Sequence, residues 1–309
     1  MKVAFCFPGQ GSQVGGMGKD LAAAFPAAGA VYEEASAAVG FDVAEACFEA
    51  STEQLTETDL QQPTLVATCL ACLRAVEATG LKPDYVIGHS VGEYAALAAA
   101  RAIHVGPAVD LVRQRGLAMA ETARRNPGAM AAVIGLEAEV VEELCASIDG
   151  VWLANYNCPG QIVVSGLYDP VDLLLEEAAA RGARRVVKLP ISGAFHSPLV
   201  SSAADGFRPA IEAVDWQEPS TPFMSTVTAQ LEGAAGLVDV LINQLTAPVR
   251  FAQAVRSLVK QGVDTFVEVG PGQVLAGLVR RCDRSATTVS VGDREGLVKL
   301  AAVVAGARA

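Results

Sequence analysis

The sequence is poor in aromatic side chains, in histidine and in positive charge. Aromatic residues make up 6% of its 309 residues, three residues are histidine, and 23 basic residues stand against 34 acidic ones. The formal net charge of −11 argues against non-specific binding to nucleic acid, whose phosphates attract basic proteins. Hydrophobic residues still make up 51% of the chain, so we expect a core of alanine, valine and leucine rather than of rings.

Long apolar runs are missing too, because charge, glycine or proline breaks each of them before the roughly 20 residues that span a membrane. The run at residues 3–7 ends at Pro8 and is too short for the core of a signal peptide. The seven cysteines are scattered and odd in number, which favours reduced thiols in the cytoplasm. Cys69 and Cys72 form a Cys-x-x-Cys without a second ligand pair, so we predict no metal there.

The order of strand-like and helix-like stretches changes twice along the chain. Up to residue 127 and again from residue 190, strands are joined by long connections, which is typical of a parallel α/β sheet. Between residues 128 and 189 the order is strand, helix, strand, strand, helix, strand, which is that of a ferredoxin-like unit. We therefore predict an α/β fold with a large domain, 1–127 and 190–309, and an inserted small domain, 128–189. The active site should open into the cleft between them.

The sequence Gly-His-Ser-Val-Gly at residues 88–92 lies between a strand-like run at 85–88 and a helix-forming stretch that begins at Glu93. A Gly-x-Ser-x-Gly in this position is the nucleophile-elbow pattern, in which a strained turn exposes the serine hydroxyl. We predict an α/β-hydrolase-like large domain with Ser90 as nucleophile and the amide of Val91 as a donor to the developing oxyanion. The alternative is a chance match in a chain with 29 glycines.

A nucleophilic serine needs a base, and the chain offers three histidines. His89 adjoins the serine, but consecutive side chains point apart, so it is better explained as a packed residue. His104 lies in a loop and has no apparent partner. His196 lies in Gly-Ala-Phe-His-Ser-Pro at residues 193–198, at the joint between the two predicted domains. By elimination we assign the base to His196.

The glycine-rich loop at residues 8–18 does not match a nucleotide-binding loop. The third glycine of a dinucleotide fingerprint would fall on Val14. A P-loop would need glycine in place of Gln13, and serine or threonine in place of Asp20. A loop at the carboxyl end of a strand can instead bring a second amide donor to the oxyanion.

Together these motifs resemble the malonyl-CoA:acyl-carrier-protein transacylase family of fatty-acid and polyketide synthesis. The resemblance covers nearly the whole chain, and the order of the motifs is far more specific than any one of them. The motifs are Phe-Pro-Gly-Gln-Gly-Ser-Gln at 7–13, Gly-His-Ser-Val-Gly-Glu-Tyr at 88–94, Arg-Gln-Arg-Gly at 113–116, Gly-Ala-Met-Ala-Ala at 128–132, Asn-Tyr-Asn-Cys-Pro-Gly-Gln at 155–161, Gly-Ala-Phe-His-Ser at 193–197 and Val-Glu-Val-Gly-Pro-Gly at 267–272.

The resemblance implies the catalytic roles. Ser90 would be the acylated nucleophile and His196 its base, oriented mainly by a backbone carbonyl rather than by a carboxylate. Gln244 matches the position that orients the histidine, with a polar residue at a helix end as the alternative. The backbone amides of Gln10 and Val91 would form the oxyanion hole.

Two further side chains would select the substrate. Arg115 would bind the free carboxylate of the malonyl group, which suits a planar guanidinium in a dry pocket. Phe195 directly precedes the base, so its ring should lie beside the acyl pocket and exclude a branched acyl group; relatives that use methylmalonyl groups carry a smaller residue there. The alternatives are a solvated helix arginine and an ordinary core aromatic.

The reaction implied by the resemblance is a transfer in two steps. The malonyl group would pass from malonyl-CoA to Ser90 and then to the phosphopantetheine thiol of an acyl carrier protein, with no cofactor and no metal. We expect a cytoplasmic monomer that meets its carrier transiently. The rivals are a serine hydrolase such as a thioesterase, and a non-catalytic module that binds the carrier. The basic residues that could dock an acidic carrier, or merely form a solvated face, are Arg184, Arg185, Lys188, Arg280, Arg281 and Arg284.

Overall fold

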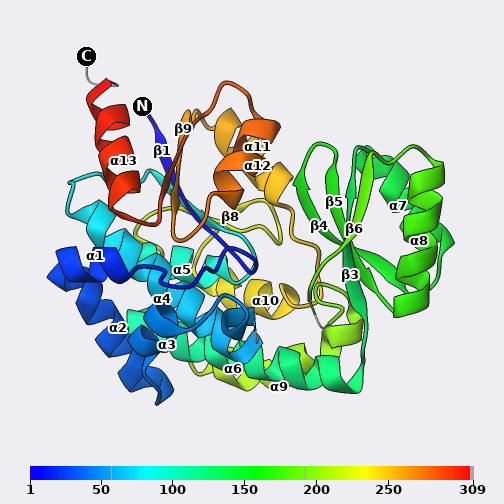
Figure 1. The fold of residues 1–309 in the computed structure, drawn as a ribbon, viewed down its shortest axis with the longest axis horizontal. Coiled ribbons are helices and arrows are strands. Elements are labelled where there is room, and N and C mark those ends of the chain that lie inside the picture. The colour runs from blue at the N-terminus through cyan, green and yellow to red at the C-terminus, as the bar shows by residue number, and fades with distance from the viewer. Residues whose placement is uncertain (57, 192, 307–309) are drawn as a thin grey trace.

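The computed structural model describes residues 1–56, 58–191 and 193–306, and these fold around two separate sheets (Figure 1). Positions 57, 192 and 307–309, all within the predicted large domain or its border, lie outside the described residues. The larger sheet has six strands in the order β10-β9-β1-β2-β7-β8, and its neighbours are parallel except for β7 and β8. The strands are β1 (Val3–Phe7), β2 (Tyr85–Gly88), β7 (Phe223–Met224), β8 (Leu231–Glu232), β9 (Thr265–Val269) and β10 (Thr287–Val291).

Helices cover both faces of this sheet and bury its central strands. Phe5 and Phe7 of β1 point into one core, and Ala4 and Cys6 into the other, because successive side chains of a strand alternate between its faces. Against the second core lie α11 (Phe251–Lys260) and α12 (Val274–Cys282). The helices of the first core are α1 (Lys19–Ala24), α2 (Pro26–Val39), α3 (Val43–Glu49), α4 (Thr58–Glu77), α5 (Gly92–Ala99), α6 (Val105–Arg125), α9 (Ser201–Glu212), α10 (Ala234–Asn243) and α13 (Arg294–Gly306).

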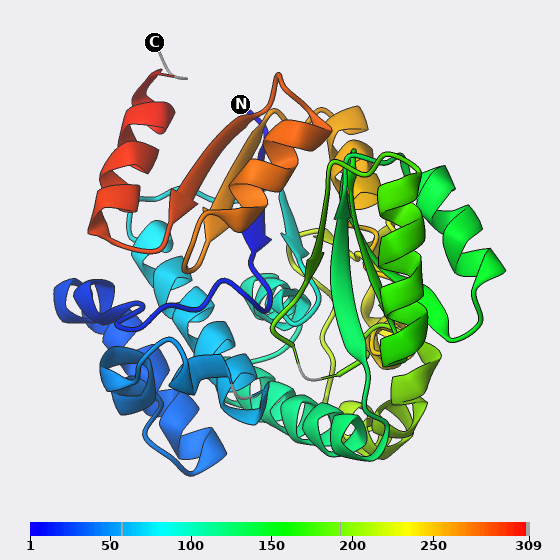
Figure 2. The same ribbon diagram turned by 45° about the vertical axis from the view of Figure 1, so that its right-hand side comes forward.

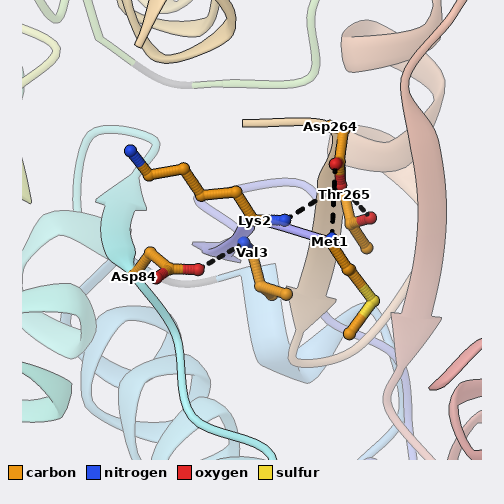
Figure 3. A network of polar contacts seen from close by, with 6 residues as sticks. All are labelled: Met1, Lys2, Val3, Asp84, Asp264 and Thr265. Carbon is orange, nitrogen blue, oxygen red and sulfur yellow. Dashed lines mark hydrogen bonds and ion pairs between the residues drawn. The ribbon is translucent and has the colours of Figure 1, made fainter. Parts of the chain in front are cut away.

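Main-chain and carboxylate contacts fix the amino end of β1 between its neighbours (Figure 3). The amide of Val3 donates to Asp84 Oδ2 at 2.7 Å, and the amide of Lys2 donates to Asp264 Oδ1 at 3.2 Å. Asp84 precedes β2 and Asp264 precedes β9, so the three central strands start in register. Their carboxyl ends therefore meet at one edge of the sheet, where loops after parallel strands form binding sites.

The smaller sheet is antiparallel and has the strand order β4-β5-β3-β6. Both views place α7 and α8 on the side that faces away from the larger sheet (Figures 1 and 2). Alternate residues of β3 serve two cores, because Ala131 and Val133 pack under these helices while Met130 and Ala132 face the larger unit. The elements are β3 (Ala129–Ile134), α7 (Ala138–Ser147), β4 (Val151–Cys158), β5 (Gln161–Gly166), α8 (Tyr168–Ala180) and β6 (Arg185–Lys188).

Most predicted elements are present with small shifts at their ends. The sequence predicts strands at 3–7, 129–134 and near 287–291, and the structure has strands with those bounds. The residues Tyr-Asn-Cys-Pro-Gly at 156–160 predict a turn between two strands. That prediction is wrong in its extent, because β4 continues to Cys158 through two irregularities in its pairing with β5. The sequence also predicts a helix near residues 248–260, and in the structure this helix begins at Phe251. No helix among the described ranges is both long and apolar enough to cross a membrane.

Candidate active site

Ser90 lies on the turn between β2 and α5, as the nucleophile-elbow pattern predicted. Its φ of +51° is in the left-handed region, which costs energy for any residue other than glycine. The turn is held by hydrogen bonds from the amide of Gly92 to His89 O at 3.0 Å and from the amide of Glu93 to Ser90 O at 2.9 Å. A Cβ atom on Gly92 would lie 2.2 Å from Phe7 O, so only glycine allows the helix to start this close to β1.

His196 is within hydrogen-bond distance of the nucleophile. Its Nε2 lies 2.9 Å from Ser90 Oγ, and its Nδ1 lies 2.9 Å from Gln244 O and 3.2 Å from Ala247 O. Carbonyl oxygens only accept, so Nδ1 carries the proton and Nε2 is left to accept the serine proton. His196 itself has a φ of +57°, and its amide donates to Leu245 O at 3.0 Å. Three main-chain oxygens of residues 244–247, which follow α10, therefore accept hydrogen bonds from His196.

The surroundings of His196 keep its imidazole neutral. Burial, and then the charges of Arg115 and His89, lower the pKa of His196 to about 3. A neutral imidazole at physiological pH is the form that can take a proton from serine. His89 points elsewhere, because its Nε2 lies 2.9 Å from Asn157 Oδ1 and its ring packs 5.5 Å from that of Phe251.

Arg115 is buried within α6, with 1% of its surface exposed, so it is not a solvated helix arginine. Its Nη2 donates to Ser90 Oγ at 3.2 Å and its Nη1 donates to Gln62 Oε1 at 2.8 Å. The guanidinium carbon lies 5.9 Å from the centre of the Tyr94 ring. The Nε atom has no partner among the described residues. A buried cation with an unused donor beside the nucleophile can receive an anionic group.

Gln10 and Val91 lie on the two segments that meet beside Ser90. Gln10 follows β1 and borders the active-site cavity. Val91 follows the serine directly and is the residue before α5, with 2% of its surface exposed. The loop and the elbow are joined where the amide of His89 donates to Phe7 O at 3.0 Å. Both predicted amide donors therefore come from the carboxyl edge of adjacent parallel strands.

A cavity of about 160 Å³ lies at Ser90, between the loops that follow β1 and β2 and one face of the smaller sheet. Phe195, 3% exposed, forms part of its wall, as expected for a ring beside the acyl pocket. A larger hollow of about 700 Å³ lies among residues 14–20 and the start of α13 and contains none of the predicted site residues. The side chains that border the cavity from the smaller sheet are Met130, Ala132, Asn155, Asn157, Gln161 and Val163.

Gln244 acts on the histidine through its main chain, and its side chain has a separate set of contacts. The residue follows the end of α10, and its Nε2 donates to Ser90 O at 3.1 Å and to a carboxylate oxygen of Glu93. Sequence reasoning assigned no role to Gln62 or Glu93. Gln62 carries no signal in the sequence beyond its place near Pro63 in α4, and Glu93 follows directly on the Gly-x-Ser-x-Gly pattern.

Some of the basic side chains suggested for docking an acidic carrier have partners within the molecule. Lys188 pairs with Asp172 at 2.5 Å. Arg281 donates to Gln161 Oε1 at 2.7 Å and to Pro159 O at 3.1 Å, so it joins α12 to the turn between β4 and β5. Its charge is therefore partly used inside the molecule. Among the residues described, no group of His, Cys, Asp and Glu side chains could hold a metal ion.

Comparison with known proteins decides the family. The model of the acyl transferase domain matches residues 4–299. The chain belongs to this family. The malonyl CoA-acyl carrier protein transacylase of Bacillus subtilis is 42% identical over 299 residues, which cover 95% of this chain and 94% of that protein. The protein of the same description from Staphylococcus aureus is 38% identical over 295 residues, covering 94% and 95%. The predicted resemblance is thereby confirmed.

Solved structures of this family share the fold. The malonyl CoA-acyl carrier protein transacylase of Clostridium perfringens superposes with a TM-score of 0.96 at 33% identity, covering 100% of this chain and 98% of that one. A malonyl-transacylase described in complex with a type II PKS acyl-carrier protein gives a TM-score of 0.93 at 34% identity, covering 97% and 98%. The predicted α/β fold with a parallel sheet is confirmed.

Proposed function

We propose that this acyltransferase moves the malonyl group from malonyl-CoA to the phosphopantetheine thiol of an acyl carrier protein, through a malonyl ester of Ser90. The observation that carries the proposal is the contact of Ser90 Oγ with both His196 Nε2 at 2.9 Å and Arg115 Nη2 at 3.2 Å. A nucleophile with its base explains acyl transfer. A buried guanidinium at the same atom explains why the acyl group carries a second carboxylate.

In the first half-reaction, Ser90 Oγ attacks the thioester carbon while its proton passes to His196 Nε2. The carbonyl oxygen becomes an oxyanion, for which the amides of Gln10 and Val91 are the donors. The tetrahedral intermediate collapses, the bond from carbon to sulfur breaks, and the CoA thiolate takes the proton from His196. Arg115 holds the malonyl carboxylate away from the reacting carbon throughout.

In the second half-reaction, the carrier thiol gives its proton to His196 and attacks the ester carbon. Ser90 leaves as the alkoxide and recovers the proton from the imidazole. The thioester already supplies an activated acyl group, so the steps balance with no cofactor.

The site is built from side chains of one chain, which is the basis for proposing a monomer. The seven cysteines lie in the described part of the chain and are free, in keeping with a reducing cytoplasm.

We also propose that the chain divides as its two sheets suggest. Residues 1–127 and 190–309 would form an α/β-hydrolase-like catalytic domain, in support of which the nucleophile lies on a strained turn between a parallel strand and a helix. Residues 128–189 would form a ferredoxin-like domain. Its support is the strand order β4-β5-β3-β6 with both helices on one face and a core of its own.

The products formed from malonyl-CoA test the proposed function. Malonyl-CoA is mixed with the enzyme in the presence and absence of a phosphopantetheinylated acyl carrier protein, and mass spectrometry follows malonyl-carrier and free malonate. The expected result is malonyl-carrier in an amount that matches the CoA released, with little free malonate. Free malonate formed at the same rate with and without the carrier would instead identify a thioesterase. A carrier that binds but is never acylated would indicate a binding module.

A further inference from the structure

Glu93 is a buried carboxylate that neither half-reaction uses. It is the second residue of α5 and is 0% exposed. Its Oε1 accepts hydrogen bonds from Thr226 Oγ1, at 2.9 Å, and from the amide of Thr226, and its Oε2 accepts one from Gln244 Nε2. Burial raises the pKa of Glu93, and these donors oppose that rise by stabilising the charged form. Burying a carboxylate costs free energy unless donors surround it, so the groups that donate to Glu93 indicate what it holds in place.

The contact between Glu93 and Gln244 joins the two halves of the catalytic pair. Gln244 Nε2 also donates to Ser90 O at 3.1 Å, so one amide group bridges Glu93 and the nucleophile's own main chain. The main-chain oxygen of the same Gln244 accepts from His196 Nδ1 at 2.9 Å. The neighbouring Leu245 O and Ala247 O hold the amide and the imidazole of His196. Residues 244–247 thus hold the base, and Gln244 ties them to the elbow.

Two acceptors, the Glu93 carboxylate and Ser90 O, bear on the direction in which the Gln244 amide points. Gln244 Nε2 lies between two acceptors, and its Oε1 has no partner among the described residues. If the amide turned over, Oε1 would face the carboxylate and the carbonyl of Ser90, and both donor contacts would be lost. Ser90 O alone disfavours that orientation, and a carboxylate at residue 93 disfavours it further. A neutral amide at residue 93 could donate to Oε1 and would weaken the preference.

We propose that Glu93 is a positioning residue, which holds Ser90 and His196 at hydrogen-bond distance by fixing the side chain of Gln244 between the elbow and residues 244–247. It takes no proton from the imidazole and touches no substrate. Its effect is on the geometry of the pair, where a displacement of about 1 Å can cost roughly a hundredfold in rate. The inference rests on the proposed function for the roles of Ser90 and His196.

The test replaces Glu93 with an isosteric neutral residue and with a shorter charged one. Glu93→Gln keeps the shape and removes the charge, while Glu93→Asp keeps the charge and changes the shape. Two rates are measured on protein shown to be folded by its melting temperature. One is inactivation by phenylmethanesulfonyl fluoride, which probes the pair without a malonyl group, and the other is CoA release from malonyl-CoA.

The expected result for Glu93→Gln is a loss of roughly tenfold or more in both rates, with the KM for malonyl-CoA changed less than about twofold, because Arg115 keeps its contacts. Glu93→Asp should recover part of that loss. If Glu93→Gln equals the wild type, or exceeds Glu93→Asp in both rates, Glu93 only fills space and the inference is wrong. If phenylmethanesulfonyl fluoride modifies Ser90 but malonyl-CoA does not acylate it, the proposed function fails while the inference is still decided by the first rate.

Glu268 provides a matched control for the cost of neutralising a buried carboxylate. It is 1% exposed and accepts from the amides of Leu275, at 2.9 Å, and Ala276, at 3.0 Å. Its side-chain hydrogen bonds among the described residues do not include one to residues 244–247. Glu268→Gln should lower the melting temperature without the tenfold loss of serine reactivity. If Glu93→Gln does not fold, Gln244→Leu tests the same link from the other side: serine reactivity should fall although the main-chain oxygen of residue 244 remains. Unchanged reactivity in that variant would overturn the inference.

Discussion

The two sheets contribute to the active-site cavity in different ways. The parallel sheet presents its carboxyl edge, where the loop after β1 and the elbow after β2 bring Gln10 and Ser90 together. The antiparallel sheet presents a face, and alternate residues of its strands form a wall in which Met130, Ala132 and Val163 are apolar and Asn155, Asn157 and Gln161 are polar. Ser90 and the predicted amide donors therefore come from loops that converge at an edge, while the wall that shapes the acyl pocket comes from side chains that repeat along strands.

This difference predicts two kinds of variant. Changes at the carboxyl edge of the parallel sheet should remove chemistry from every substrate. Changes in the wall, or in the residues that bridge edge and wall, should alter which acyl group is accepted and leave the chemistry in place.

A large loss of chemistry on every substrate is expected for His196→Ala, because the imidazole contacts Ser90 at this edge. The serine loses the group that accepts its proton, so acylation by malonyl-CoA should slow by roughly 10²–10⁴-fold, measured as CoA release in a stopped-flow experiment. The control is His104→Ala, since His104 is exposed and its side chain does not cap α6. A His196→Ala variant with near-normal turnover at neutral pH would place the base elsewhere.

Arg115→Ala should lower the rate with malonyl-CoA, whose acyl group is charged, more than the rate with acetyl-CoA, whose acyl group is neutral. Only the malonyl group carries a second carboxylate, and losing its partner in a buried site costs about 2–5 kcal/mol, so malonyl transfer should fall far more than acetyl transfer. Arg113→Ala is the matched control, because Arg113 is on the same helix but contacts Val39 O and the ring of Phe41. The ratio of kcat/KM for the two acyl-CoAs is the measurement. Equal losses on both substrates would make Arg115 a structural residue.

Arg115→Ala should also shift the pH dependence of the reaction between Ser90 and His196 to higher pH. The charge of Arg115 is the second cause, after burial, of the low pKa of about 3 at His196. Without that cation the imidazole accepts a proton more readily, so its pKa rises and the loss of activity in acid begins at a higher pH. Inactivation of Ser90 by phenylmethanesulfonyl fluoride, followed from pH 8 down to the wild-type pKa of about 3, measures this shift without a malonyl group. An acid limb that stays in place would contradict the coupling.

Phe195→Ser should have the smallest effect on the chemistry and should act on selectivity. Phe195 bridges the base and the wall, and its ring lies against the cavity. A ring that overlaps a methyl branch disfavours it by roughly 1–3 kcal/mol, so the variant should gain methylmalonyl-CoA acylation relative to malonyl-CoA. Competition between the two acyl-CoAs for Ser90, read by mass spectrometry, gives the ratio. A less stable protein with an unchanged ratio would mean that Phe195 is only a core residue.

The features that were predicted correctly from the sequence are those encoded by residues close together in the chain. The elbow at Ser90 depends on two glycines and one strand, all within a few residues, and the histidine followed by elimination. Arg115 came from the family resemblance alone, since nothing in a helix marks an arginine as buried. The two-residue strands β7 and β8 are too short to leave a pattern.

The contacts missed by sequence reasoning join distant parts of the chain. Gln62 meets Arg115 from 53 positions away, and Gln244 meets Glu93 from 151 positions away. Such pairs depend on how helices pack over the sheet, which no local pattern in one sequence records. The extension of β4 to Cys158 also depends on contacts between segments. Pairing with β5 keeps residues 156–158 in the strand although their sequence is typical of a turn.

The identity of the acylated residue tests the account most directly. Wild-type protein and Ser90→Ala are incubated with malonyl-CoA without a carrier, and the intact mass and the modified peptide are measured. The account predicts one malonyl group on the wild type, located at Ser90 and lost on addition of carrier thiol, and none on Ser90→Ala at an unchanged melting temperature. A malonyl adduct at another residue, or an adduct that persists in Ser90→Ala, would contradict it.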